Sequence, residues 1–109
     1  MERAVVVSRL GMGDGVPELS LILLEKYLKS SLENDDVKIV YAFYNRGVQV
    51  LTDDRIQPLL VQLEAAGAQL YFCGTCLEYY GIAKQLNVGR VACINDIRHI
   101  MNAYRCDFL

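Results

Sequence analysis

The segment Arg3–Ser8 constrains the fold of this chain more than any other segment. It reads Arg-Ala-Val-Val-Val-Ser, a near-continuous run of apolar and mostly β-branched residues. Such runs are typical of strands covered on both faces, as parallel strands in α/β proteins are. A length of 109 residues suffices for one compact domain and is too short for two. The sequence therefore predicts a single domain, residues 1–109, with this strand at its centre.

Strand-like and helix-like apolar spacings alternate along the rest of the chain. This alternation predicts an α/β fold, namely a three-layer α/β/α sandwich built on a mainly parallel sheet of about five strands. We expect Asp53 or Asp54 to cap the second helix and Asn95 to cap the last. The predicted strands are 3–8, 37–43, 48–51, 69–72 and 91–93, and the predicted helices are 19–32, 56–66, 76–84 and 96–104.

The first predicted helix has an apolar stripe that is wider than one contact with a sheet requires. Exposed apolar patches of this kind usually mark interfaces, and Tyr79 and Tyr80 add aromatic surface elsewhere. We therefore expect part of this helix to pack on another subunit, so that the protein is a homo-oligomer. The stripe consists of Leu19, Ile22, Leu23 and Tyr27, widened by Leu21, Leu24 and Leu28.

Composition excludes several classes of partner. A hydrophobic content of 53% argues against disorder, and a net charge of -2 supplies no broad positive field for nucleic acid. The longest apolar run, Leu21–Leu24, is far too short to span a membrane. Four cysteines are too few for a disulfide scaffold. We expect a cytoplasmic protein with reduced thiols that binds neither nucleic acid nor a membrane.

The run Cys73-Gly74-Thr75-Cys76 is the sharpest chemical signal, because it joins the end of a predicted strand to a predicted helix. Helix amino termini stabilise thiolates, which are the nucleophilic form of cysteine. Cys76, one helical turn later, is positioned to resolve a mixed disulfide or persulfide on Cys73. We expect Cys73, at an edge open to solvent, to be the most reactive thiol, and Tyr71, Phe72, Tyr79 and Tyr80 to form apolar walls.

Other interpretations of the cysteines are open. Both members of the pair are alternatively small buried hydrophobes, as free cysteines often are. A thioredoxin-type dithiol site is less well matched, because the following helix is short and soon meets Gly81. Zinc binding lacks a second closely spaced ligand pair, since Cys93, Cys106 and His99 are scattered. We expect core packing for Cys93, an incidental terminal thiol at Cys106, a surface position for His99, and neither metal nor cofactor.

Two further loops follow predicted strands, where ligands bind in open α/β sheets. Gly11-Met12-Gly13 precedes the first helix and is a candidate anion cradle, although it matches neither the dinucleotide nor the P-loop spacing. A plain tight loop explains these glycines equally well. Asn45 and Arg46 follow the second strand, and Arg46 is suited to an anionic ligand or a thiolate, or is simply a solvated turn residue.

Three segments together resemble the DsrE/DsrF-like superfamily, most nearly the carboxyl-terminal domain of YedF-type proteins. They are Met12–Leu19, Phe43–Val48 and Cys73–Gly81, the last with the downstream run 86–89. The resemblance implies an oligomeric α/β/α domain, a role in sulfur relay or selenium metabolism, and a persulfide-bearing cysteine at Cys73. We expect no amino-terminal sulfur-carrier domain of the YedF type in this protein, so that a sulfur donor or acceptor would be a separate chain.

The sequence thus supports two functions of different class. The first is sulfurtransferase-like handling of sulfane sulfur or selenium, with Cys73 as the nucleophile and Cys76 as the resolving or auxiliary thiol. The second is a non-catalytic module that binds a small ligand or a sulfur-carrier protein. A dithiol oxidoreductase is a third. The candidate ligand-binding residues are Gly11, Met12, Gly13, Asn45, Arg46, Gly74 and Thr75.

Overall fold

A computed structural model describes residues 2–109 and confirms the predicted α/β fold. Its five strands form one sheet in the order β4-β3-β2-β1-β5, and every neighbouring pair runs parallel. Parallel neighbours require crossover connections, which the helices supply. The strands are β1 (Arg3–Val7), β2 (Val40–Phe43), β3 (Gln69–Cys73), β4 (Arg90–Ala92) and β5 (Arg105–Phe108).

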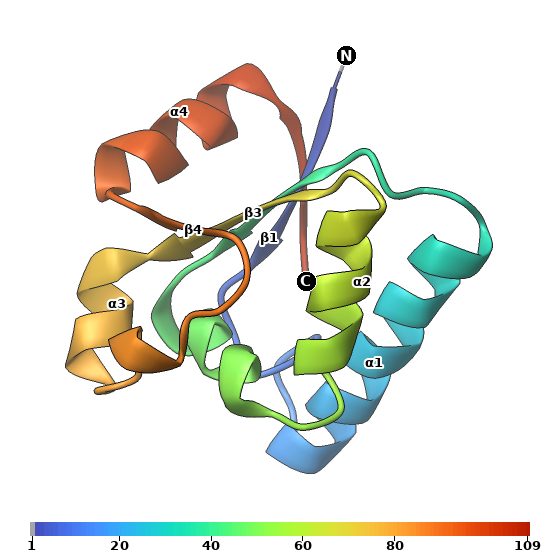
Figure 1. The fold of residues 1–109 in the computed structure, drawn as a ribbon, viewed down its shortest axis with the longest axis horizontal. Helices are drawn as coiled ribbons and strands as arrows, with labels where there is room; N and C mark the ends of the chain where they lie inside the picture. The colour runs from blue at the N-terminus through green and yellow to red at the C-terminus, as the bar shows by residue number, and fades with distance from the viewer. Residues whose placement is uncertain (1) are drawn as a thin grey trace.

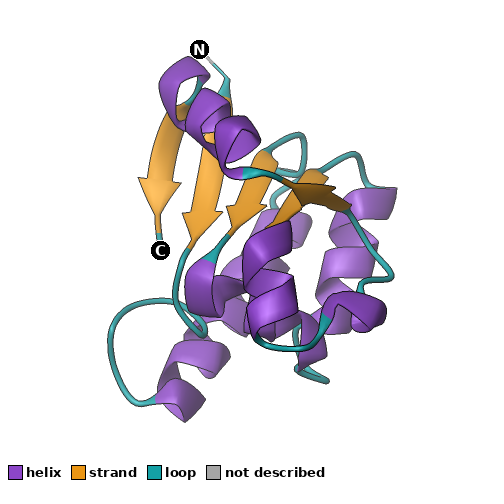
Figure 2. Ribbon diagram, turned by 90° about the vertical axis from the view of Figure 1, so that its left-hand side faces the viewer, coloured by secondary structure: helices purple, strands orange, loops and turns teal. Residues whose placement is uncertain are grey.

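The helices lie on both faces of the sheet (Figures 1 and 2). α1 and α2 cover one face, whereas α4 covers part of the opposite face. α3 begins directly where β3 ends, at the carboxyl edge of the sheet. The helices are α1 (Pro17–Glu33), α2 (Gln57–Ala65), α3 (Gly74–Tyr79) and α4 (Ile94–Ala103), with 3₁₀ helices η1 (Asn45–Thr52) and η2 (Ala83–Gln85).

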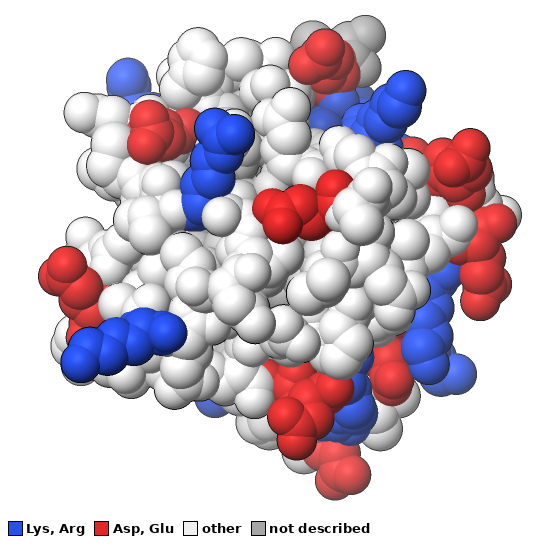
Figure 3. All heavy atoms as spheres, viewed as in Figure 1, with Lys and Arg blue, Asp and Glu red and all other residues white. Residues whose placement is uncertain are grey.

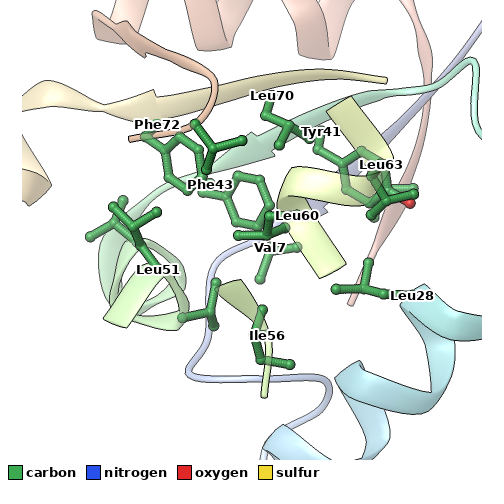
Figure 4. Close-up of a cluster of buried hydrophobic side chains, with 14 of the residues drawn as sticks. Val7, Leu28, Tyr41, Phe43, Leu51, Ile56, Leu60, Leu63, Leu70 and Phe72 are labelled. Carbon is green, nitrogen blue, oxygen red and sulfur yellow. The ribbon is translucent and has the colours of Figure 1, made fainter. Parts of the chain in front are cut away.

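The main hydrophobic core lies between the sheet and the α1/α2 layer (Figure 4). Val5 and Val7 of β1 point into it, and Ala4 belongs to a smaller cluster beneath α4. The rings of Phe43 and Phe72 stack in adjacent strands with centroids 4.4 Å apart. Burial on both faces is the reason that β1 reads as a continuous β-branched run.

The predicted strand 48–51 is wrong, because this segment is the 3₁₀ helix η1. Val48, Val50 and Leu51 are buried, so their apolar pattern reflects packing against the core and not strand alternation. The missed strand is β5, which pairs with β1 at the edge of the sheet. Its polar residues Arg105 and Asp107 gave no strand signal.

The buried face of α1 differs from the predicted stripe. Leu21, Leu24 and Leu28 face the core, whereas Leu19 and Leu23 are 54% and 42% exposed. The predicted stripe is centred on Leu19 and Leu23, one position away from residues that face the core. A shift of one position along an α-helix rotates the side-chain direction by about 100°, so the two sets lie on different sides of α1. The exposed Leu19 and Leu23 therefore do not form part of the hydrophobic core.

The predicted helix caps are also wrong. Asp53 accepts a hydrogen bond from the backbone N–H of Arg55 at 2.9 Å, so its carboxylate closes a turn before α2 instead of capping the helix. At α4 the cap is Cys93, two residues before the predicted Asn95. The third predicted helix, 76–84, is two pieces, α3 and η2, because the chain turns at Gly81 with a φ of 68°.

Candidate functional site

The two cysteines of the Cys73–Cys76 motif line one groove at the carboxyl edge of the sheet. Cys73 is the last residue of β3 and the N-cap of α3, as the sequence predicts, and Cys76 follows in the first turn. The groove has a volume of about 280 Å³ and mostly apolar walls. Its lining residues are Tyr44, Asn45, Cys73, Thr75, Cys76, Tyr79, Tyr80 and Ile94.

The sulfur of Cys76 is held by the chain that follows β2. The backbone N–H of Asn45 donates to Cys76 Sγ at 3.0 Å, and Asn45 adopts a φ of 54° to present it. Burial chiefly raises the pKa of Cys76, and a hydrogen bond with the Cys73 side chain adds to this, whereas the Asn45 N–H opposes it. Cys76 is therefore a weaker acid than an exposed cysteine, and the Asn45 N–H is the contact that favours its thiolate.

The two thiols differ in exposure in the opposite sense to the prediction. Cys73 is only 5% exposed, whereas Cys76 is half-buried. Cys73 ends β3, and α3 follows it without a connecting loop. The groove that Cys73 lines with Cys76 is the opening beside its side chain. Which of the two is the better nucleophile stays a prediction.

The remaining cysteines lie away from this groove. Cys93 is exposed at the start of α4, so its predicted place in the core of a strand is wrong. Its thiol lies 3.2 Å from the Asp96 carboxylate. Cys106 is a free thiol that is half-buried in β5, where burial raises its pKa, so it is part of the sheet and not an incidental terminal thiol. His99 is exposed on α4, as predicted. Among residues 2–109, no group of three potential metal ligands gathers.

The glycine-rich loop borders a second, smaller cavity of about 170 Å³. Gly13, Asn45 and Arg46 line it, so the structure brings these three predicted residues together. Gly11 and Met12 line neither cavity. A Cβ at Gly11 would lie 2.3 Å from the Ser20 backbone, and the Met12 N–H donates to the Ser20 carbonyl at 2.9 Å, so this part of the loop holds the chain against α1.

Gly74 also has a structural role and lies outside both linings. A Cβ at this position would lie 2.8 Å from Val91 Cγ1, so a larger residue here would have to displace the Val91 side chain of β4. Of the predicted apolar walls, Tyr79 and Tyr80 line the cysteine groove. Phe72 is instead buried in the main core, and Tyr71 lies on the opposite side of the sheet.

Several lining residues are not predicted from the sequence. Tyr44 and Ile94 complete the cysteine groove, and Ser8 and Arg9 line the second cavity. Each of them comes within two residues of the end of β1, β2 or β4. The rule that ligands bind beyond the carboxyl ends of parallel strands carries a signal for all four, because those ends share one edge.

Charge is mixed over the surface. On the face drawn in Figure 3, acidic and basic side chains are interspersed around a largely uncharged centre. In the part of the chain that the structure describes, no helix is long and apolar enough to cross a membrane. The expectation that the chain binds no nucleic acid stays a prediction.

Comparisons with known proteins bear on the fold and the family. The ychN protein from E. coli has a TM-score of 0.74 and 14% identity, with all of both chains covered. A conserved protein of unknown function from Bacteroides thetaiotaomicron, BT1422, has a TM-score of 0.68 and 15% identity, covering 99% of this chain and 95% of that one. These likenesses show the fold. No curated protein sequence matches. The model of the DsrE/DsrF-like family matches residues 18–105, most of the sequence, and the chain therefore belongs to the DsrE/DsrF-like family.

Proposed function

We propose that this protein handles sulfane sulfur, or the chemically similar selenium, as a sulfurtransferase-like member of a sulfur relay. The observation that carries the proposal is the pair of free cysteines, Cys73 and Cys76, in one groove at the carboxyl edge of the sheet. Membership of a family generally associated with sulfur relay supports it. The resemblance of Cys73–Gly81 to the carboxyl-terminal domain of YedF-type proteins also favours a link to selenium metabolism.

The proposed transfer needs no oxidant. The Cys73 thiolate attacks the outer sulfur of a donor persulfide, R–S–SH, the S–S bond breaks, and the donor leaves as the thiol R–SH after protonation. Cys73 then carries the sulfane sulfur as a persulfide. An acceptor thiolate attacks that outer sulfur in turn, which restores the Cys73 thiolate and moves the sulfur onward.

Cys76 has two roles in this scheme. It lines the same groove as Cys73, so it forms part of the surface that a donor or acceptor contacts. In the absence of an acceptor, the Cys76 thiolate attacks the inner sulfur of the Cys73 persulfide. This step forms a Cys73–Cys76 disulfide and releases hydrosulfide, so that both cysteines are oxidised while the sulfane sulfur is reduced.

Intact-protein mass spectrometry after incubation with a small persulfide donor tests the assignment. We expect the parent protein to gain the mass of one sulfur atom and then to lose it as the Cys73–Cys76 disulfide forms, and Cys73→Ala to gain none. Cys76→Ala should keep the added sulfur longer, because it cannot resolve the persulfide. Cys93→Ala is the matched control, since Cys93 is exposed and lies outside the groove. Full sulfur loading of Cys73→Ala would overturn the proposal.

A binding module is the second candidate, and the shape of the groove favours it. Cys73 is buried, whereas Tyr79 and Ile94 on the rim are 84% and 67% exposed. Such apolar rims fit a docked partner, and a sulfur-carrier protein is the partner that the cysteines suggest. Stoichiometric binding of a carrier by Cys73→Ala, with no sulfur transfer by the parent protein, would favour this function.

We further propose a cytoplasmic location and a homo-oligomeric state. The cysteines of the described chain are all free, and the cytosol keeps thiols reduced. Leu19 and Leu23 are exposed on α1, where a second copy of the chain would bury them. The proposed function requires neither a cofactor nor a metal ion.

A further inference from the structure

The second cavity of the carboxyl edge takes no part in the proposed sulfur chemistry. It lies between the loop that follows β1 and the first turn of η1, and its volume is about 170 Å³. The lining is more polar than that of the cysteine groove, and it combines charged side chains, hydroxyls and glycines. Its residues are Ser8, Arg9, Leu10, Gly13, Asp14, Gly15, Pro17, Ser20, Asn45 and Arg46.

Two arginines line this cavity, one from the loop after β1 and one from the start of η1. Arg9 follows β1 and Arg46 follows β2, and these strands are parallel neighbours whose ends are in register at Val7 and Phe43. Within residues 2–109, neither arginine forms an ion pair. Arg46 Nε donates only a long hydrogen bond, 3.4 Å, to the Gln49 side chain. Both guanidinium groups therefore keep donors free for a ligand.

The remaining lining residues set the charge and the size of that ligand. Asp14 is the only carboxylate among the lining residues, so the two arginines leave a net charge of +1. Ser20 is buried, with 4% of its surface exposed, and its hydroxyl donates to the Gly13 carbonyl at 3.4 Å, a weak bond that an anionic acceptor would replace favourably. About 170 Å³ is room for a tetrahedral anion and a few waters, since a water occupies about 30 Å³.

We propose that this cavity binds a tetrahedral oxyanion, such as a phosphate or sulfonate group, between Arg9 and Arg46. Asn45 lines both this cavity and the cysteine groove. The oxyanion is therefore either a free ion or one end of a small molecule whose apolar remainder extends past Asn45 toward Tyr79. Binding depends on the arginines and not on the cysteine chemistry.

Titration of isotope-labelled protein with inorganic phosphate, followed by NMR amide shifts, tests the site. We expect the shifts to concentrate in residues 8–20 and 45–47. Arg9→Gln and Arg46→Gln should each weaken binding about tenfold, because each removes a charge-assisted hydrogen bond. Asp14→Asn should tighten binding severalfold by removing a like charge. Arg98→Gln, exposed on α4 and outside the cavity, is the control for general loss of positive charge.

Phenyl phosphate distinguishes the two sources of the oxyanion. Tighter binding than inorganic phosphate, with added shifts at Tyr79 and Ile94, indicates a molecule that spans both cavities, whereas equal binding without those shifts indicates a free ion. Cys73→Ala should bind phosphate as the parent does, so failure of the sulfur proposal leaves this one intact. Absence of phosphate shifts at the loop, or equal affinity in the Arg9, Arg46 and Arg98 variants, would overturn it.

Discussion

At the scale of single residues, the two groove cysteines are distinguished by their surroundings and not by their spacing. Cys73 is almost fully buried beneath α3, and Cys76 is half-buried with its sulfur on the Asn45 N–H. Burial raises the pKa of Cys76, and the Asn45 N–H opposes this by favouring its thiolate. Cys76 is therefore the more accessible thiol, whereas the proposed nucleophile is Cys73.

We predict that alkylation of Cys76 rises at a higher pH in the folded protein than in the unfolded protein. Burial raises the pKa of Cys76, and iodoacetamide reacts with the thiolate, so a smaller fraction reacts at any given pH. Labelling across a pH series, followed by peptide mapping, measures the midpoint. The same cysteine in urea is the control, since exposure changes its rate but not that midpoint. A lower midpoint in the folded protein would contradict a pKa of Cys76 that is raised by burial.

Gly47 supports the site through a close backbone contact. A Cβ at this position would lie 1.9 Å from the Val7 carbonyl oxygen, so η1 packs directly on the end of β1. We predict that Gly47→Ala lowers the free energy of unfolding by about 3 kcal/mol or more, through overpacking. Gly13→Ala is the matched control: a Cβ there meets no atom within 4 Å, and its φ of 84° costs about 1 kcal/mol. Urea denaturation compares the two, and equal losses would refute the contact.

At the scale of elements, the carboxyl edge of the sheet assembles everything that the proposals use. β1, β2 and β3 end side by side, so the glycine-rich loop, the start of η1 and the start of α3 meet although they are far apart in the chain. The Asn45–Cys76 hydrogen bond joins two of these connections. Parallel pairing therefore produces both the cysteine groove and the arginine-lined cavity beside it.

α1 presents leucines on two different faces, which predicts a large effect of the same substitution on one face and a small effect on the other. Leu24 is fully buried, so Leu24→Ala should lower the free energy of unfolding by about 3 kcal/mol through lost burial and a cavity. Leu19→Ala removes a side chain that is 54% exposed and should change monomer stability by less than about 0.5 kcal/mol. Urea denaturation at low protein concentration measures both. Similar losses would show that the assigned core face is wrong.

The fold was predictable from sequence wherever a segment is buried on a regular period. α2 shows this through its helical apolar period, and β1 through the continuous apolar run of a strand that is buried on both faces. η1 was not predictable, because its buried valines mimic strand alternation, and β5 was hidden by its polar edge residues. At the site, the Cys73 position followed from the strand end. Its burial did not, because burial depends on how closely α3 follows.

At the scale of the whole molecule, the apolar surface is uneven. Val16, Leu19 and Leu23 are 68%, 54% and 42% exposed, and spacings of three and four residues place them on one side of α1. The hydrophobic core of the monomer does not use these three side chains, because Leu21, Leu24 and Leu28 of the same helix already pack into it. Burial against a second copy would remove this surface from water.

We predict that the protein sediments as a homo-oligomer at micromolar concentration and that the α1 face holds it together. Leu19→Glu with Leu23→Glu should shift it toward the 12.3 kDa monomer, because a carboxylate buried in an apolar interface is strongly unfavourable. Val61→Glu is the matched control, since Val61 is 44% exposed on α2 and lies outside that face. A parent protein that sediments as a monomer would refute oligomerisation. An oligomer that the Leu19 and Leu23 changes leave intact would instead assign its interface to another surface, and the exposed leucines would then have no role in assembly.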